Sequence, residues 1–114
     1  MRTISGVRRK AIAVEVRDLA TGCDFAALAH ELTTEGIFVS TFYDLPVGAE
    51  VSLEIALGPG TVLVKGTVES VRAANSGAPG FVVLFDEISQ AGRALISAHL
   101  WSRAPTTRSN PVAG

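Results

Sequence analysis

Two short segments of the sequence carry side chains suited to holding a small phosphorylated ligand. Residues 8–10 are three consecutive cations, and residues 31–36 combine a carboxylate at Glu31, a hydroxyl at Thr33 and a glycine at Gly36. Arginines hold phosphates through forked, charge-assisted hydrogen bonds, and their planes stack on bases. A carboxylate and a hydroxyl can accept from or donate to a base edge. If the two segments meet in the fold, they suit a small nucleotide dianion.

Other chemistries find little support in the sequence. His30 and His99 are the only histidines, and no HExxH or CxxC pattern accompanies them, so we expect no metal site. The serines have no nucleophile turn around them, and Gly58–Gly60 is predicted to be a hairpin turn rather than a phosphate loop. The chain is therefore predicted not to be an enzyme.

Composition indicates a single globular domain. The 114 residues are 47% hydrophobic and 18% charged, which is enough to bury one core. A net charge of −1 gives no overall attraction to a nucleic acid polymer, so any anion site must be local. The lone cysteine, Cys23, is expected to be a buried or strand-end thiol in a reducing compartment. Without a signal peptide or an apolar run of membrane length, we expect a cytoplasmic location and no membrane insertion.

Most of the chain has the two-residue alternation of half-buried strands. In residues 11–18, Ile12, Val14 and Val16 share one face. Residues 24–32 have the composition of a helix but also alternate, and their surroundings favour a strand. Further strands are expected at 36–42, 49–57, 61–72 and 81–85. A short hairpin loop is expected between the strands at 49–57 and 61–72.

Three local expectations follow from these strand patterns. Gly36 is expected to supply a positive φ at the turn before its strand. In residues 61–72, one face is expected to carry Val62, Val64, Gly66, Val68 and Ser70. The continuous apolar run of residues 81–85 is typical of a strand covered on both faces.

After residue 88, the spacing of apolar residues changes from the two-residue period of a strand to the period of a helix. Ser89 is a good N-cap, and residues 90–102 contain no proline, so we predict one amphipathic helix there. Its apolar stripe is expected to comprise Ala91, Leu95 and Ala98, flanked by Ala94 and Trp101.

These elements predict a mainly β fold, a six-stranded antiparallel β-barrel with a C-terminal α-helix across its mouth. Residues 1–7 are expected to form a flexible arm, 8–102 a single domain and 103–114 a disordered tail.

The order of elements resembles that of PilZ domains, over about residues 8–102. In that family an RxxxR segment precedes the first strand, and a D/N-x-S-x-x-G motif lies on the barrel. Glu31 stands at the Asp/Asn position, Thr33 at the Ser position and Gly36 at the Gly position. Residues 37–41, 45–54, 66–71 and 80–85 resemble the strands that follow.

The sequence departs from the family pattern in the cationic segment. No two arginines have the RxxxR spacing, because Ser5 precedes Arg9 and Ile12 follows Arg8 at that distance. Lys10 can supply a point charge but lacks the arginine fork. Glu31 and Thr33 are each one carbon larger than the residues that the motif calls for.

The resemblance implies a non-enzymatic signalling module that binds cyclic di-GMP weakly or conditionally, with no cofactor, and relays the signal through contacts with a protein partner. The alternative is a PilZ-like adaptor that no longer binds cyclic di-GMP and acts in motility or polarity only through protein–protein interaction. The ligand-binding residues implied by the resemblance are Arg8, Arg9, Lys10, Glu31, Thr33 and Gly36.

Overall fold

The computed structural model describes residues 11–73 and 77–102. The predicted fold is confirmed, because six antiparallel strands close into a barrel that is followed by one helix. The elements are β1 (Ile12–Asp18), β2 (Asp24–His30), β3 (Gly36–Ser40), β4 (Glu50–Ala56), β5 (Thr61–Arg72), β6 (Gly80–Ile88) and α1 (Gln90–Ser102). The predicted arm, residues 1–7, the cations at 8–10 and the predicted tail at 103–114 lie outside the described residues.

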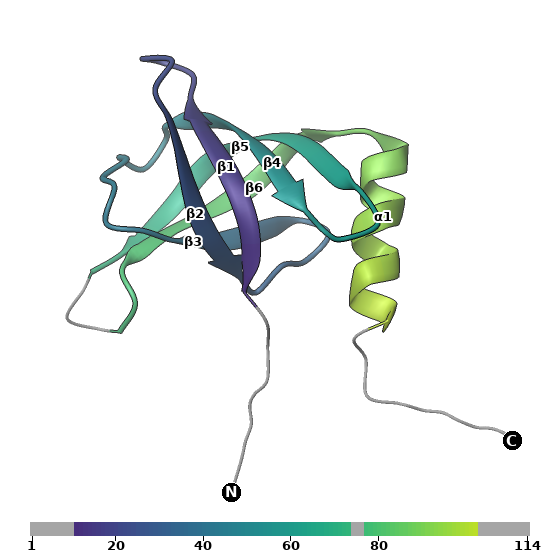
Figure 1. Ribbon diagram of the computed structural model, residues 1–114. Coiled ribbons are helices and arrows are strands. Elements are labelled where there is room, and N and C mark those ends of the chain that lie inside the picture. The colour runs from purple at the N-terminus through teal and green to yellow at the C-terminus, as the bar shows by residue number, and fades with distance from the viewer. Residues whose placement is uncertain (1–10, 74–76, 103–114) are drawn as a thin grey trace, which may run out of the picture.

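The strands follow the order β1-β2-β3-β6-β5-β4, and β4 pairs with β1 to close the barrel. Helix α1 stands against one end of the barrel, whereas the β1–β2 hairpin projects from the other end (Figure 1). Because the sheet closes on itself, none of the six described strands is an open edge with a long row of unpaired backbone donors and acceptors.

Residues 24–30 form a strand, as the surrounding strands led us to expect for residues 24–32. Strand β2 pairs along its length with β1, from Ile12 opposite Ala29 to Arg17 opposite Asp24, and its end pairs with β3. Ala29 is fully buried, and Phe25 and Ala27 pack against the core. Pairing on both sides therefore outweighs the helix propensity of alanine and leucine.

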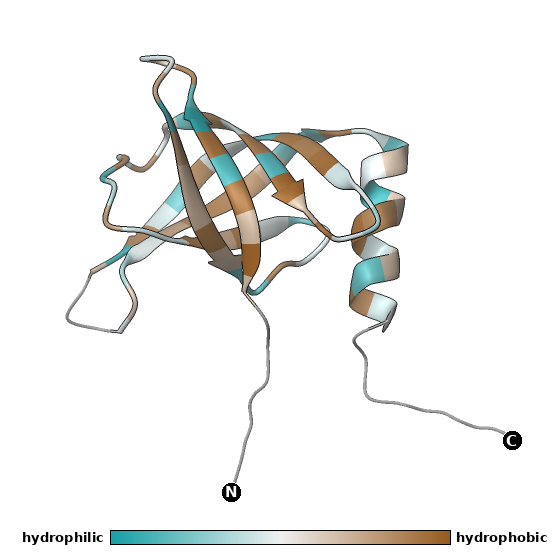
Figure 2. Ribbon diagram, in the orientation of Figure 1, coloured by the Kyte–Doolittle hydropathy of each residue, from teal (hydrophilic) through white to brown (hydrophobic). Residues whose placement is uncertain are grey.

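The core lies inside the barrel, and apolar and polar residues alternate along several strands (Figure 2). On β6, the prediction that residues 81–85 are covered on both faces is wrong. Phe81 and Val83 are buried, but Leu84 is exposed. A strand of this barrel has only one face inside, so the apolar run reflects strand propensity as well as burial.

The expected face of Ser70 is wrong, because a β-bulge precedes this residue. Val62, Val64 and Val68 point into the barrel as predicted, but the register between β5 and β6 shifts between Val68 and Ser70. Ser70 then lies opposite Val82, on the outer face. The extra residue in a bulge reverses which side chains point outward. The bulge thereby places Arg72, two residues further on, on the outer face as well.

Helix α1 begins and ends where predicted, but its buried face is different. The Ser89 hydroxyl accepts the N–H of Gly92 at 2.9 Å, which confirms the N-cap. The expected stripe is wrong except for Leu95, since Trp101 is 83% exposed. The exposed face comprises Ala91, Ala94, Ala98 and Trp101, and the face toward the barrel comprises Gly92, Leu95, Ile96, His99 and Leu100.

The larger aliphatic side chains decide which face of α1 is buried. Ile96 is fully buried in the barrel core, and Leu95 packs against that core. Gly92 allows the close approach, since a Cβ atom there would lie 2.9 Å from Val62 Cγ1. Alanine is equally compatible with either face, so the alanine spacing could not locate the contact.

Candidate functional site

The turn at residues 31–36 links β2 to β3 and is closed by the Thr33 hydroxyl. Its oxygen accepts the N–H groups of Glu35 and Gly36, both at 3.0 Å, and its proton is donated to the Gly36 carbonyl at 3.3 Å. A hydroxyl has one donor and two acceptor positions, so all three are used within the turn. Thr33 therefore holds the shape of the turn in this structure.

Gly36 is required for close packing, and its predicted positive φ is wrong. The positive-φ glycines of the described chain do not include it. A Cβ atom at Gly36 would lie 2.6 Å from the carbonyl oxygen of Val83 on the neighbouring strand β6. The left-handed residue is instead Glu31, with a φ of 56°. Asn and Asp adopt this conformation more readily than most residues, which suits the Asp/Asn position of the motif.

The turn is held against both the barrel and the helix. The Phe85 N–H of β6 donates to the Glu35 carbonyl at 2.8 Å, and Arg93 of α1 donates to the Thr34 carbonyl at 3.4 Å. Two elements distant in sequence from the turn, β6 and α1, thus fix its position. The result is an anchored polar rim at the helix end of the barrel.

Glu31 contacts an arginine that the sequence analysis did not single out. Its carboxylate oxygens accept from both terminal nitrogens of Arg72, at 3.1 and 3.4 Å. The Arg72 guanidinium carbon lies over the Phe38 ring, 4.2 Å from its centre. Alternation alone would place Arg72 inside the barrel, so only the bulge after Val68 reveals this cluster.

The predicted cations at residues 8–10 lie outside the described residues, but their point of attachment is clear. The described chain begins at Ala11, and Ile12 lies opposite Ala29 near the end of β2. The turn starts two residues after Ala29. The first strand therefore begins at the barrel end that carries the turn, and residues 8–10 immediately precede it in sequence.

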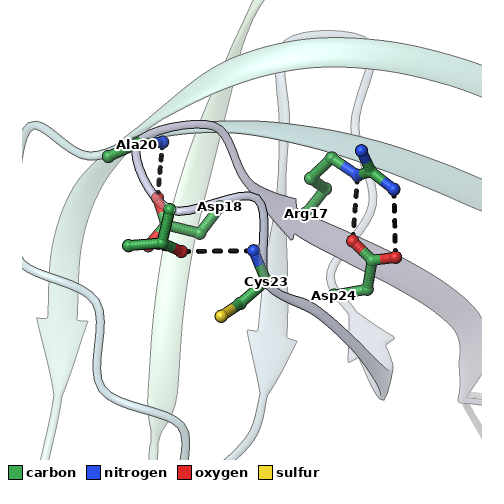
Figure 3. A network of polar contacts seen from close by, with 6 residues as sticks. Arg17, Asp18, Ala20, Cys23 and Asp24 are labelled. Carbon is green, nitrogen blue, oxygen red and sulfur yellow. Dashed lines mark hydrogen bonds and ion pairs between the residues drawn. The ribbon is translucent and has the colours of Figure 1, made fainter.

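A second polar cluster lies at the opposite end of β2, in the β1–β2 hairpin (Figure 3). The buried Asp18 carboxylate accepts the Ala20 N–H at 3.1 Å and the Thr21 hydroxyl at 3.2 Å. Arg17 and Asp24 form an exposed ion pair at 2.9 Å. Cys23 is exposed directly before β2, so it is a strand-end thiol and not a buried one. These contacts shape the hairpin.

An aromatic pair packs near this hairpin. The rings of Tyr43 and Phe25 stack with centres 4.2 Å apart, and Phe81 meets Phe25 edge-on. Partial desolvation raises the pKa of the Tyr43 phenol above its ordinary value, and the neighbouring Cys23 thiol raises it further. The phenol is therefore neutral at physiological pH, and its ring contributes to packing.

Residues 11–73 and 77–102 contain no group of three or more His, Cys, Asp or Glu side chains placed to hold a metal ion. Within the same residues, no helix is both long and apolar enough to cross a membrane.

Replacing Thr33 by valine tests the structural role of its hydroxyl. We expect the free energy of unfolding to fall by about 1 kcal/mol, because two backbone N–H groups lose their acceptor while the side-chain shape is kept. Urea denaturation measures the change. Thr34→Val is the control, since the Thr34 hydroxyl makes no hydrogen bond within the described chain, and it should cost less than about 0.5 kcal/mol. Equal costs for both variants would contradict the assigned role of Thr33.

The sequence matches no family model and no curated protein. Solved structures, in contrast, include close matches of fold. The Bacillus subtilis inhibitor of motility, MotI/DgrA, superposes with a TM-score of 0.71 at 15% identity over 95% of this chain. The PilZ domain of CeSA from a cellulose-synthesizing bacterium superposes with a TM-score of 0.59 at 12% identity, over 84% of this chain and 97% of that domain.

These comparisons confirm that the barrel and its terminal helix have a PilZ-like fold. The chain spans 56% of the length of the MotI/DgrA structure. At such low identity the similarity concerns the fold, and the function must be argued from the site.

Proposed function

We propose that this chain is a non-enzymatic receptor module for cyclic di-GMP that passes the signal to a protein partner in the cytoplasm. The PilZ-like fold and the similarity to a protein described as an inhibitor of motility support a role in motility control. The proposed ligand lies between the cations at residues 8–10 and the turn at residues 31–36. Binding would join two segments that are separate in sequence and so create a new surface for the partner.

The observation that supports this proposal is that β1 begins at the barrel end that carries the turn, directly after the cations in sequence. Ile12 lies opposite Ala29, and the turn follows within two residues of Ala29. Since an extended residue spans at most about 3.5 Å, residues 8–10 are within a few residues' reach of the turn. The turn itself is anchored to β6 and α1 by hydrogen bonds, so it offers a preformed surface for one side of the ligand.

The division of roles follows from charge. Cyclic di-GMP carries two phosphates, and the chain as a whole is close to neutral. The phosphates must therefore be held by local cations, for which Arg8 and Arg9 provide forked donors and Lys10 a point charge.

Two side chains of the motif favour a second function, that of an adaptor that does not bind the nucleotide. Both side chains are already engaged in contacts within the protein. The Thr33 hydroxyl is fully used within the turn, and Glu31 is bound to Arg72. Neither group is available to a base edge unless these contacts rearrange. The adaptor would use the same barrel and helix but recognise only protein.

An NMR titration with cyclic di-GMP distinguishes the two functions. If the chain is a receptor, backbone amide signals of residues 8–10 and 31–36 should shift together as ligand is added. The double variant Arg8→Ala, Arg9→Ala should bind at least about tenfold more weakly, because charged phosphate contacts are lost. Arg17→Ala removes one cation from β1 beside the β1–β2 hairpin, at the other end of the barrel, so it is the control and should bind normally.

The opposing outcome is also well defined. If no amide shifts at high micromolar ligand, the receptor proposal is wrong and the adaptor is favoured. Shifts confined to the β1–β2 hairpin would contradict the proposed location.

A further inference from the structure

We infer that Arg72, backed by the ring of Phe38, is a base-stacking residue for a guanine of the ligand; this inference rests on the proposed function and extends its site. The motif comparison does not assign Arg72 any role. Its assignment comes from three observations on the outer face of the barrel: a covered aromatic ring, a guanidinium above it, and a carboxylate that fixes the guanidinium.

The first observation is the position of Phe38. It alternates with the core residues Ile37 and Val39, so its ring points outward, yet it is only 4% exposed. Gly80 packs beside it, since a Cβ atom at Gly80 would lie 2.8 Å from Phe38 Cζ. An outward aromatic ring is thus held tightly against the sheet.

The second observation is what lies above this ring. The Arg72 guanidinium carbon is 4.2 Å from the ring centre, while the Arg72 side chain is still 44% exposed. One side of the cation therefore rests on an aromatic ring and part of its surface faces solvent. A supported guanidinium of this kind is suited to stacking on a nucleobase, because the planar group is already ordered before the base arrives.

The third observation is the contact with Glu31, which is the first residue of the motif-like turn. Its carboxylate binds both terminal nitrogens of Arg72 and so fixes the guanidinium beside the proposed ligand site. The ion pair also neutralises the charge of Arg72. We therefore assign Arg72 to a base and leave the phosphates to the cations at residues 8–10. Guanine is the base, because the proposed ligand contains no other.

The test compares two Arg72 variants with a matched control. Arg72→Lys keeps the charge and can still pair with Glu31, but it lacks a planar group. Arg72→Ala removes both. We expect each variant to bind cyclic di-GMP about 10- to 100-fold more weakly in calorimetry, the range for loss of one base stack. Arg17→Ala removes an arginine from a similarly exposed ion pair at the other end of β2, and it should bind as wild type does.

Two further readouts separate stacking from charge and from folding. The affinity lost in Arg72→Lys should be the same at low and high salt, whereas a lost phosphate contact matters less as salt screens it. In the wild-type protein, the Arg72 Nε–H resonance should shift on ligand addition. Thermal melting verifies that each variant is folded.

The failures can be told apart. If the wild-type protein binds and Arg72→Lys binds equally well, the stacking assignment is overturned while the receptor function stands. If Arg72→Ala alone is weakened, Arg72 acts as a charge and the assignment is likewise overturned. If the wild-type protein does not bind at all, the receptor function fails and takes this assignment with it.

Discussion

Replacing Gly36 by alanine is expected to lower the free energy of unfolding by about 3 kcal/mol. The new Cβ atom would lie 2.6 Å from the Val83 carbonyl oxygen and 3.2 Å from Leu84 Cδ2. The first of these neighbours is backbone of the paired strand β6, which cannot rotate away as a flexible side chain can. Strands β3 and β6 would have to separate at the start of β3, where Gly36 lies opposite Leu84. Urea denaturation followed by circular dichroism measures the loss.

Gly60→Ala is the matched control for this prediction. Its Cβ atom would meet only the flexible end of the Leu95 side chain, at 3.4 Å from Cδ1 and 4.0 Å from Cδ2, and Gly60 has no positive φ. Alanine also restricts the unfolded chain, so this variant should be neutral or more stable by up to about 1 kcal/mol. A Gly36→Ala protein as stable as Gly60→Ala would show that β3 and β6 are not packed closely at this point.

This prediction bears on how the motif glycine is understood. Gly36 was expected to serve the turn through a positive φ, but the structure uses it for strand packing. The left-handed position is five residues earlier, at Glu31. The close packing of strands in the barrel therefore requires a glycine at the end of this motif. Its presence is evidence for the fold and is not by itself evidence for ligand binding.

The sequence was most informative where burial repeats at a fixed period. Strand β5 and helix α1 have their predicted bounds, since alternation and the Ser89 N-cap define them locally. The choice of strand for β2 was also correct, although its composition favours a helix. There the surrounding strands carried more information than propensity, and the alternation of Phe25, Ala27 and Ala29 was compatible with them.

The sequence was least informative where a contact depends on distant parts of the chain. The bulge between Val68 and Ser70 leaves no trace in the alternation, yet it turns Arg72 outward. Glu31 and Arg72 are 41 positions apart, and neither is unusual by itself. The sequence therefore suggests the turn as a candidate site, but the contact of Arg72 with Glu31 and Phe38 beside it could not be predicted.

The spacing of apolar residues in α1 predicts where the helix lies in the sequence, but it does not predict which face of the helix is buried. Both faces of α1 have small or apolar residues at helical spacing, and the exposed face even includes the tryptophan. The face of Gly92 and Ile96 is buried because Ile96 fills the barrel core and Gly92 allows a close approach to Val62. A mutation on each face tests this selection directly.

Replacing Ile96 by alanine is expected to cost about 2–5 kcal/mol of stability. Its side chain is fully buried in the barrel core, and truncation leaves a cavity between α1 and the strands. Trp101→Ala is the control on the opposite face. Although tryptophan is the larger residue, it is 83% exposed, so its loss should change stability by less than about 0.5 kcal/mol. Equal destabilisation by the two variants would contradict the helix orientation.

The same pair of variants links the helix to the candidate site. Arg93 of α1 donates to the Thr34 carbonyl, so a helix that no longer packs through Ile96 releases one anchor of the turn. Amide signals of residues 33–36 should then shift or broaden in Ile96→Ala and stay unchanged in Trp101→Ala. If they are unchanged in both, the turn is held by strand β6 alone, through the Phe85 N–H and the Glu35 carbonyl. The position of α1 would in that case affect stability but not the geometry of the proposed ligand site.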